Sequence, residues 1–317
     1  MDIYGFLHCA FIVSESMFYF QATNKNCGCV LMLLKAYAKI NLSLHVLGTR
    51  PDSYHELRTV MQTIDLYDIL EISMANDIEL ELELIDPKAE LSAGEDNLAC
   101  RAALLLRQHT GFSGGARIKL VKKIPLAAGL AGGSADAAAV LRGLNCFWDL
   151  NLSPAELMEI GALIGSDVPF CLLGGTALAW GRGEIIEQLP ALPTWGVLLV
   201  KPTFGLSTAQ VYRLYDQSDN FKHQEKHNSI QLGGNCTLRS LSACLSNDLE
   251  KAVLPLYPEI KNIQQAIAAV GATGVLMSGS GPTVFGLFAD KSMAERATAQ
   301  LCFEDGQVYV TEFCTIE

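Results

Sequence analysis

The sequence predicts a mixed α+β protein. Stretches in which apolar and polar residues alternate, as in strands, lie both before and after segments with helical spacing, and the two kinds do not alternate regularly. This order favours an α+β fold over repeated βαβ units. The chain has 317 residues, 50% of them hydrophobic, so it can bury a substantial core in one large or two medium domains.

The first organised element is a strand. From Ala36 to Val46 apolar residues alternate with polar ones, which predicts a half-buried strand. Lys39 and Asn41 lie on its polar side and point in the same direction, because side chains repeat with a period of two along a strand. We therefore expect the two side chains to serve one site.

Further strands and a helix follow. Strands are predicted at 60–64, 69–74 and 78–84, and another at 116–121. Between them, apolar residues recur at helical spacing over 97–110, and Gly111 is placed to end that helix.

The segment from Pro125 to Ala135 is rich in glycine and lies between a predicted strand and a predicted helix. Gly129, Gly132 and Gly133 allow the backbone to approach a ligand closely. If Ser134 begins the helix, the free N–H groups of the first helical turn and the positive end of the helix dipole form a site for phosphate. The segment lacks the lysine of a P-loop and the fingerprint of a Rossmann fold. An ordinary strand-to-helix turn is the alternative.

Asp167 is a candidate catalytic residue. Helices are predicted over 135–147 and from the capping box at 153–156 to about residue 164. Asp167 then lies in a short turn between a helix and an apolar strand, where Gly165 and Pro169 restrict the backbone. An aspartate in such a turn also serves commonly as a hydrogen-bonding turn residue.

A second unit is predicted to begin near 189–194. It contains a strand at 195–200, helices near 208–215 and 259–270, and a strand around MSGSGPTVFGLF. The glycines of MSGSGPT mark either a bulge or a close backbone approach to a ligand or another loop. The polar stretch 217–234 predicts an exposed loop.

Composition excludes several classes of protein. A net charge of -11 and a pI near 5.0 argue against a general nucleic-acid or anionic-membrane partner, so an anionic ligand needs a locally basic pocket. The ten cysteines show no zinc-ligand spacing and indicate reduced, buried side chains in a cytoplasmic protein.

Residues 1–32 resemble neither a signal peptide nor a membrane span. We interpret them as a loosely attached extension, with Met32 as a candidate working start.

Four of these segments, taken in order along the chain, resemble the GHMP kinase superfamily: the strand with Lys39, the glycine-rich segment, the Asp167 turn and MSGSGPT. AYAKINLSLHVLG, PDSYHEL, GEDNL, PLAAGLAGGSADAAAVLRGLN, GSDVPF and SNDLE are similar to the members that phosphorylate a cytidine diphosphate polyol. The resemblance covers roughly residues 33–317. It implies a two-domain α+β GHMP kinase fold, with an ATP-binding domain over 33–190, a C-terminal domain over 191–317, and the active site in the cleft between them.

The resemblance also implies an activity and the residues that perform it. The chain would use ATP and Mg²⁺ to phosphorylate the 2-hydroxyl of 4-diphosphocytidyl-2-C-methyl-D-erythritol in the non-mevalonate isoprenoid pathway. Asp167 would be the acid/base residue and Lys39 its cationic partner. ATP would contact Pro125, Leu126, Ala127, Ala128, Gly129, Leu130, Ala131, Gly132, Gly133, Ser134 and Ala135, with Asn97 and Lys122 as weaker candidates.

For the acceptor, the resemblance places Tyr54 and His55 against the cytosine and Tyr212 on its other face, with Asn41 and Thr208 nearby. From the residues alone, Tyr54 and His55 could form only a turn. Either Ser134 or Asp136 could meet the magnesium ion, although an acid in the first turn of a helix also complements the dipole there.

Some features leave other interpretations open. Alanine stands at positions 127, 128, 131 and 135, where glycine or serine can occur, and it favours negative φ, so the sequence does not define which amides bind phosphate. Lys119 and Lys122 fit solvated surface positions.

The alternative functions are a homoserine, mevalonate or sugar kinase, diphosphomevalonate decarboxylase, or a catalytically silent binding protein of the same fold. The sequence indicates no particular oligomeric state.

Overall fold

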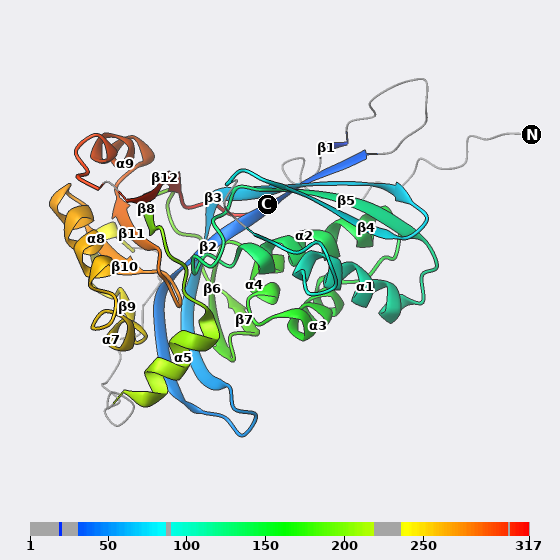
Figure 1. Ribbon diagram of the computed structural model, residues 1–317, viewed down its shortest axis with the longest axis horizontal. Coiled ribbons are helices and arrows are strands. Elements are labelled where there is room, and N and C mark those ends of the chain that lie inside the picture. The colour runs from blue at the N-terminus through cyan, green and yellow to red at the C-terminus, as the bar shows by residue number, and fades with distance from the viewer. Residues whose placement is uncertain (1–18, 21–30, 87–89, 219–235, 304, 317) are drawn as a thin grey trace, which may run out of the picture.

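The computed structural model describes residues 19–20, 31–86, 90–218, 236–303 and 305–316. Nearly all of the predicted polar loop at 217–234, and most of the N-terminal extension, lie outside these ranges. Within them the chain forms two sheets, each covered by helices, which agrees with the predicted α+β class (Figure 1). The predicted division at residue 190 stays a prediction.

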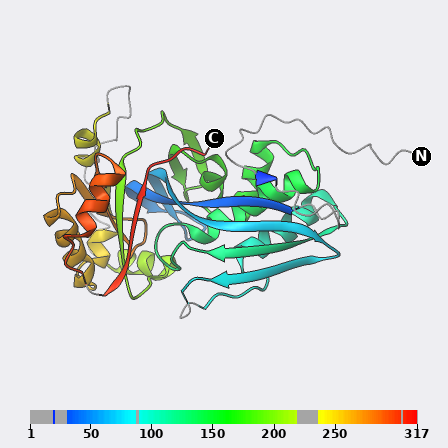
Figure 2. The same ribbon diagram turned by 90° about the horizontal axis from the view of Figure 1, so that it is seen from above.

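Two long antiparallel strands form the centre of the larger sheet, β2 (Leu31–Thr49) and β3 (His55–Ala75). The two strands predicted at 60–64 and 69–74 are both parts of β3. Figure 2 shows β2, β3, β5 and β4 side by side. The other strands of this sheet are β1 (Tyr19–Phe20), β4 (Ile78–Leu84), β5 (Gly115–Lys122), β6 (Thr176–Gly181), β7 (Ile185–Gln188) and β9 (Ser246–Asn247).

The prediction that β2 is half-buried is wrong for its central part. Residues 38–46 are all buried, polar and apolar alike. Helices cover the apolar side and the loop at 278–281 approaches the polar side, while β9 pairs with β2 at its edge. Lys39 and Asn41 therefore do lie on one side of the strand as predicted, but inside the protein.

Four helices cover one face of the larger sheet: α1 (Leu98–Thr110), α2 (Gly132–Phe147), α3 (Pro154–Ile164) and α4 (Val168–Leu173) (Figure 1). The predicted capping box at the start of α3 is confirmed, as is the left-handed Gly111 that ends α1. Two predictions need correction. Helix α2 begins at Gly132, before Ser134.

The second correction concerns Asp167, which lies between two helices and not between a helix and a strand. Residues 168–173 form α4, and the strand β6 begins only at Thr176. Pro169 is compatible with the first turn of α4, because the N–H that proline lacks has no helical partner there. Gly174, with φ 72°, ends the helix.

The smaller sheet has the antiparallel order β10-β11-β8-β12, and α8 and α9 lie against it (Figure 1). Its strands are β8 (Gly196–Pro202), β10 (Gly274–Met277), β11 (Val284–Phe288) and β12 (Gly306–Glu312). The helices of this part are α5 (Thr208–Gln217), α6 (Leu238–Ser242), α7 (Glu250–Val253), α8 (Pro258–Ala269) and α9 (Lys291–Thr298). No sequence pattern predicted α6, α7, α9, β9 or β12.

Two buried apolar clusters stabilise the fold, one mainly beneath the larger sheet and one mainly around the smaller sheet. The seven cysteines in the described ranges are free, but only Cys100 and Cys171 are buried, so the predicted burial holds for these two. In the described part of the chain, no helix combines the length and apolar character that crossing a bilayer requires.

Candidate active site

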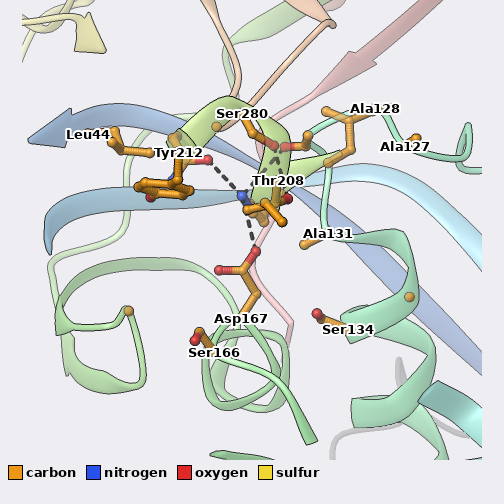
Figure 3. A pocket seen from close by; sticks show the side chains of 18 of the residues that line it. Leu44, Ala127, Ala128, Ala131, Ser134, Ser166, Asp167, Thr208, Tyr212 and Ser280 are labelled. Carbon is orange, nitrogen blue, oxygen red and sulfur yellow. Dashed lines mark hydrogen bonds and ion pairs between the residues drawn. The ribbon is translucent and has the colours of Figure 1, made fainter. Parts of the chain in front are cut away.

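A pocket of about 790 Å³ lies where the two parts of the chain meet. One wall is the segment predicted to bind phosphate, residues 125–134, which we call the phosphate loop. The opposite walls come from β2, the turn before α4, and α5 (Figure 3). Nearly all predicted site residues line it: Lys39, Asn41, Tyr54, His55, Lys122, Asp167, Thr208, Tyr212 and the whole of the phosphate loop. Asn97 and Ala135 do not. Asn97 instead caps α1, since its side chain accepts a hydrogen bond from the Ala99 amide.

Lys39 is held by several contacts at the centre of the pocket. Its Nζ lies 3.4 Å from Asp167 Oδ2 and donates to Asn41 Oδ1 at 2.7 Å. Asn41 in turn donates to the Thr59 hydroxyl at 2.8 Å. A buried ammonium with a carboxylate and an amide oxygen as partners has little freedom to reorient, so its positive charge is held at a fixed position in the pocket.

Asp167 precedes α4, and its side chain makes no capping hydrogen bond. The missing hydrogen bond disagrees with the alternative in which Asp167 serves only as a hydrogen-bonding turn residue. The carboxylate is 34% exposed and points toward the Lys39 side of the pocket, while Ser134 enters the same space from the start of α2 (Figure 3). Asp167 is therefore free to interact with a ligand that reaches Lys39.

The phosphate loop uses a backbone conformation that the alanines were not expected to adopt. Ala127 and Ala131 have φ values of 48° and 57°, in the left-handed region that disfavours side chains with a Cβ. Gly129 shares this conformation, with φ 74°. The loop is also joined to β2, because the Lys39 amide donates to the Leu130 carbonyl at 3.1 Å. Strained residues of this kind cluster at ligand sites.

Lys122 is not a solvated surface residue. Its ammonium is buried and contacts two buried carboxylates, Asp68 and, at 2.6 Å, Asp136. Asp68 also accepts the Ile124 amide at 2.8 Å, at the entrance to the phosphate loop. Burial raises the pKa of Asp136 to about 8, opposed by Lys122 and reinforced by Asp68. The three side chains thus connect the two ends of the phosphate loop.

Aromatic residues form the far end of the pocket. The His55 ring stacks on Tyr212, with centroids 4.7 Å apart, and its Nε2 lies 2.7 Å from Asp216 Oδ1. Tyr54 is 53% exposed, and the Arg182 guanidinium lies 4.9 Å from its ring centroid. A base held between two rings needs a centroid separation of about 7 Å. The implied arrangement with His55 and Tyr212 on opposite faces of the base is therefore not the one observed.

Several residues of the pocket carry no signal in the sequence that predicted them. Arg182, Arg213 and Asp216 line it, yet no motif signal marked them. Ser280 was within a marked glycine motif, and its hydroxyl lies 3.1 Å from that of Thr208. Four basic side chains, Lys39, Lys122, Arg182 and Arg213, line the pocket together with the carboxylates of Asp167 and Asp216, so a locally basic pocket stays a prediction.

The comparisons with known proteins agree with this geometry. Residues 97–175 match the model of the GHMP kinase N-terminal domain, and residues 234–305 match that of the GHMP kinase C-terminal domain. The fold and the pocket together therefore define a small-molecule kinase of the GHMP class.

A narrower family is also shown. The chain is 49% identical over 278 residues to the 4-diphosphocytidyl-2-C-methyl-D-erythritol kinase of Pelotomaculum thermopropionicum, a match covering 87% of this chain and 96% of that protein. A crystal structure of 4-(cytidine 5'-diphospho)-2C-methyl-D-erythritol kinase matches with a TM-score of 0.71 and 35% identity, over 89% of this chain and 99% of the other. The chain belongs to the 4-diphosphocytidyl-2-C-methyl-D-erythritol kinase family of GHMP kinases.

More distant GHMP kinases share only the fold. The homoserine kinase of Cytophaga hutchinsonii matches with a TM-score of 0.64 but 17% identity, over 92% of this chain and 96% of that one. A likeness at this level does not distinguish one acceptor from another.

Proposed function

We propose that this chain transfers the γ-phosphate of ATP to the 2-hydroxyl of 4-diphosphocytidyl-2-C-methyl-D-erythritol, with Asp167 as the acid/base residue and Lys39 as its electrostatic partner. The observation that carries this proposal is the Lys39–Asp167 pair, 3.4 Å apart, in a pocket with a phosphate loop at one end and aromatic rings at the other. The 49% identity to a kinase named for this acceptor supports the choice of substrate.

The phosphate loop would bind the ATP phosphates. Its left-handed residues turn the backbone toward the pocket, and the free N–H groups and positive dipole end of α2 favour anionic oxygens there. Lys39 would then lie near the γ-phosphate and the acceptor oxygen, and its ammonium would stabilise the charge that develops on both.

Asp167 would receive the proton of the acceptor hydroxyl. A carboxylate is too weak a base to deprotonate a ground-state alcohol, so the proton leaves late, as the new P–O bond forms. Phosphoryl transfer allows this because its transition state is usually loose. Positioning and charge stabilisation would therefore supply most of the acceleration, with Asp167 orienting the hydroxyl.

Magnesium would accompany ATP and neutralise charge on the transferred phosphate. Ser134 fits this role better than Asp136, because the Ser134 hydroxyl faces the pocket whereas the Asp136 carboxylate is buried against Lys122. Mg²⁺ needs only one or two protein ligands when phosphates complete its shell. We also propose that the protein acts in the cytoplasm, which the seven free cysteines among the described residues support.

The acceptor base would bind at the aromatic end, where Tyr54, His55 and Tyr212 lie. Because His55 and Tyr212 are already stacked, the base would use an outer ring face and not the space between them. Arg182 and Arg213 would place positive charge near the diphosphate.

The direct test is the variant Asp167→Asn, which keeps the shape of the side chain but removes its basicity. We expect kcat to fall by about 10²–10⁴-fold while ATP affinity changes by less than about threefold. Steady-state kinetics and titration calorimetry with ATP measure the two quantities. A variant with near-normal kcat would refute the assigned role.

The acceptor is tested separately, by assaying the unmodified protein with the cytidyl substrate beside mevalonate, homoserine and galactose. We expect kcat/KM to be at least about 10³-fold higher for the cytidyl substrate, because the other three lack a base to stack. Comparable turnover of any of the others would favour the corresponding kinase instead.

A further inference from the structure

The SNDLE segment, residues 246–250, has no role in the function described so far. It lies between β2, which carries Lys39, and the glycine loop, which we define as residues 278–281. Its strand β9 pairs in parallel with β2 at Ser43 and Leu44. The segment therefore contacts the two elements that meet at the centre of the pocket.

Asn247 forms the connection to the glycine loop. It is 6% exposed, and its Nδ2 donates to two carbonyl oxygens, those of Met277 at 2.9 Å and Gly279 at 2.8 Å. Its Oδ1 accepts the Leu249 amide at 3.0 Å. One buried amide thus uses both of its donor hydrogens on the backbone just before and within the glycine loop.

The rest of the segment fixes Asn247 itself. The Asp248 amide donates to the Leu44 carbonyl at 2.9 Å, and the Asp248 carboxylate accepts the Val46 amide at 3.0 Å, both on β2. On the other side, Glu250 Oε1 accepts the Met277 amide at 2.8 Å. These bonds hold Asn247 at a set distance from both β2 and the glycine loop.

The glycine loop in turn contacts the reacting centre. A Cβ at Gly279 would stand 3.0 Å from Asn41 Oδ1 and 3.5 Å from Lys39 Nζ, so the backbone there packs directly against these side chains. Ser278 Oγ donates to the Gly129 carbonyl in the phosphate loop at 3.0 Å. A shift of the glycine loop would therefore move both Lys39 and the phosphate loop.

We infer that Asn247 is a positioning residue for phosphoryl transfer, which acts by holding the glycine loop against Lys39 and Gly129. This inference rests on the proposed function for its effect on turnover. Asn247 contacts neither ATP nor the acceptor in this account. Its contribution is to fix the relative position of the cation and the phosphate loop, where a displacement of about 1 Å can cost about 10²-fold in rate.

The test is Asn247→Asp, which keeps the acceptor oxygen for Leu249 but replaces the double donor by a carboxylate facing two carbonyls. The matched control is Asn145→Asp. Asn145 makes the same kinds of bond: its side chain donates to the Leu152 carbonyl and accepts a hydrogen bond from the Leu152 amide, both at 3.0 Å. It does not line the pocket.

For N247D we expect kcat to fall about 10²-fold and the Kd for ATP to rise about 10-fold, with the acceptor KM within about threefold. For N145D we expect all three constants to change less than about threefold, even where Tm falls equally.

Equal kcat and ATP affinity in N247D and N145D would overturn the inference. If N247D does not fold, Asn247→Ser is compared with Asn145→Ser. The serine hydroxyl keeps one donor, so we expect kcat to fall about 10-fold only at position 247, and equal losses at both positions would likewise overturn the inference. If the unmodified chain does not phosphorylate the cytidyl substrate, the proposed function fails, while the ATP affinities of N247D and N145D still decide the role of Asn247.

Discussion

The two ends of the pocket are built differently. At the phosphate end, backbone loops and buried polar or charged side chains from both parts of the chain hold one another, as Lys39, Asn247 and Lys122 illustrate. At the acceptor end, a few side chains form the wall, and Tyr54 is more than half exposed. Under the proposed function, the fold would fix the geometry of transfer, whereas individual side chains would select the acceptor. Substitutions at the phosphate end should therefore lower kcat, and those at the acceptor end should raise the acceptor KM.

After Asp167→Asn, the largest effect is expected for Lys39→Met, which keeps the length of the side chain and removes its charge. We expect kcat to fall about 10²–10³-fold, because the developing charge loses its stabilising cation, with little change in the acceptor KM. Steady-state kinetics with each substrate varied in turn measure both constants.

Lys35→Met is the matched control. Lys35 lies on the same strand and its ammonium lies 4.2 Å from the centroid of the Tyr67 ring, outside the pocket lining. We expect it to change kcat less than about threefold. If K39M raised the acceptor KM and left kcat intact, the assignment of rate to the phosphate end would be wrong.

A second prediction concerns the buried charges beneath the phosphate loop. The raised pKa of Asp136, about 8 against 3.8 for an ordinary aspartate, means that the folded chain retains a proton that the unfolded chain releases. This contribution to the free energy of unfolding is fully present below about pH 4 and is lost as the pH rises toward 8. For Asp136→Asn, which cannot titrate, we expect stability to fall less steeply with pH, by up to about 1.4 kcal/mol per pH unit.

Urea denaturation of both proteins at pH 5, 6.5 and 8 measures this difference in slope. The kcat of D136N should fall less than that of K39M, because Asp136 supports the phosphate loop through Lys122 without lining the pocket itself. Parallel stability curves would show that Asp136 is ionised in the folded protein throughout this range.

The sequence predicted much of the fold because local signals there agree with the tertiary structure. The capping box of α3 and the alternation in β2 are properties of neighbouring residues, and both define real elements. The alternation could not reveal that the polar side of β2 is covered, since the loop that covers it comes from positions 278–281, far away in the sequence. Residues 168–173 were predicted as part of a strand because a short apolar run fits either structure.

The site was predicted unevenly for a similar reason. Lys39, Asp167 and the phosphate loop lie in motifs, so the family resemblance identified them, and the structure brings them together. Lys122 was interpreted as a surface lysine because its partners, Asp68 and Asp136, are 54 and 14 positions away in sequence. Arg182 and Asp216 approach the pocket only through tertiary packing, and single-sequence patterns carry no information on that.

The smallest effects are expected at the acceptor end, where substitutions should raise the acceptor KM and leave kcat nearly unchanged. For Tyr212→Ala we expect the acceptor KM to rise about 10-fold, because stacking on a base contributes about 1–3 kcal/mol and the support of the His55 ring is lost as well. For Tyr54→Ala we expect a rise of only about threefold, since its ring is 53% exposed and less of the base can be desolvated there. In both variants kcat should change less than about threefold, because the proposed transfer uses Lys39 and Asp167 and neither tyrosine. Steady-state kinetics at saturating ATP separate the two constants. A fall in kcat comparable to that of K39M would mean that the aromatic end also positions the hydroxyl for transfer, and that the two ends of the pocket act as one unit.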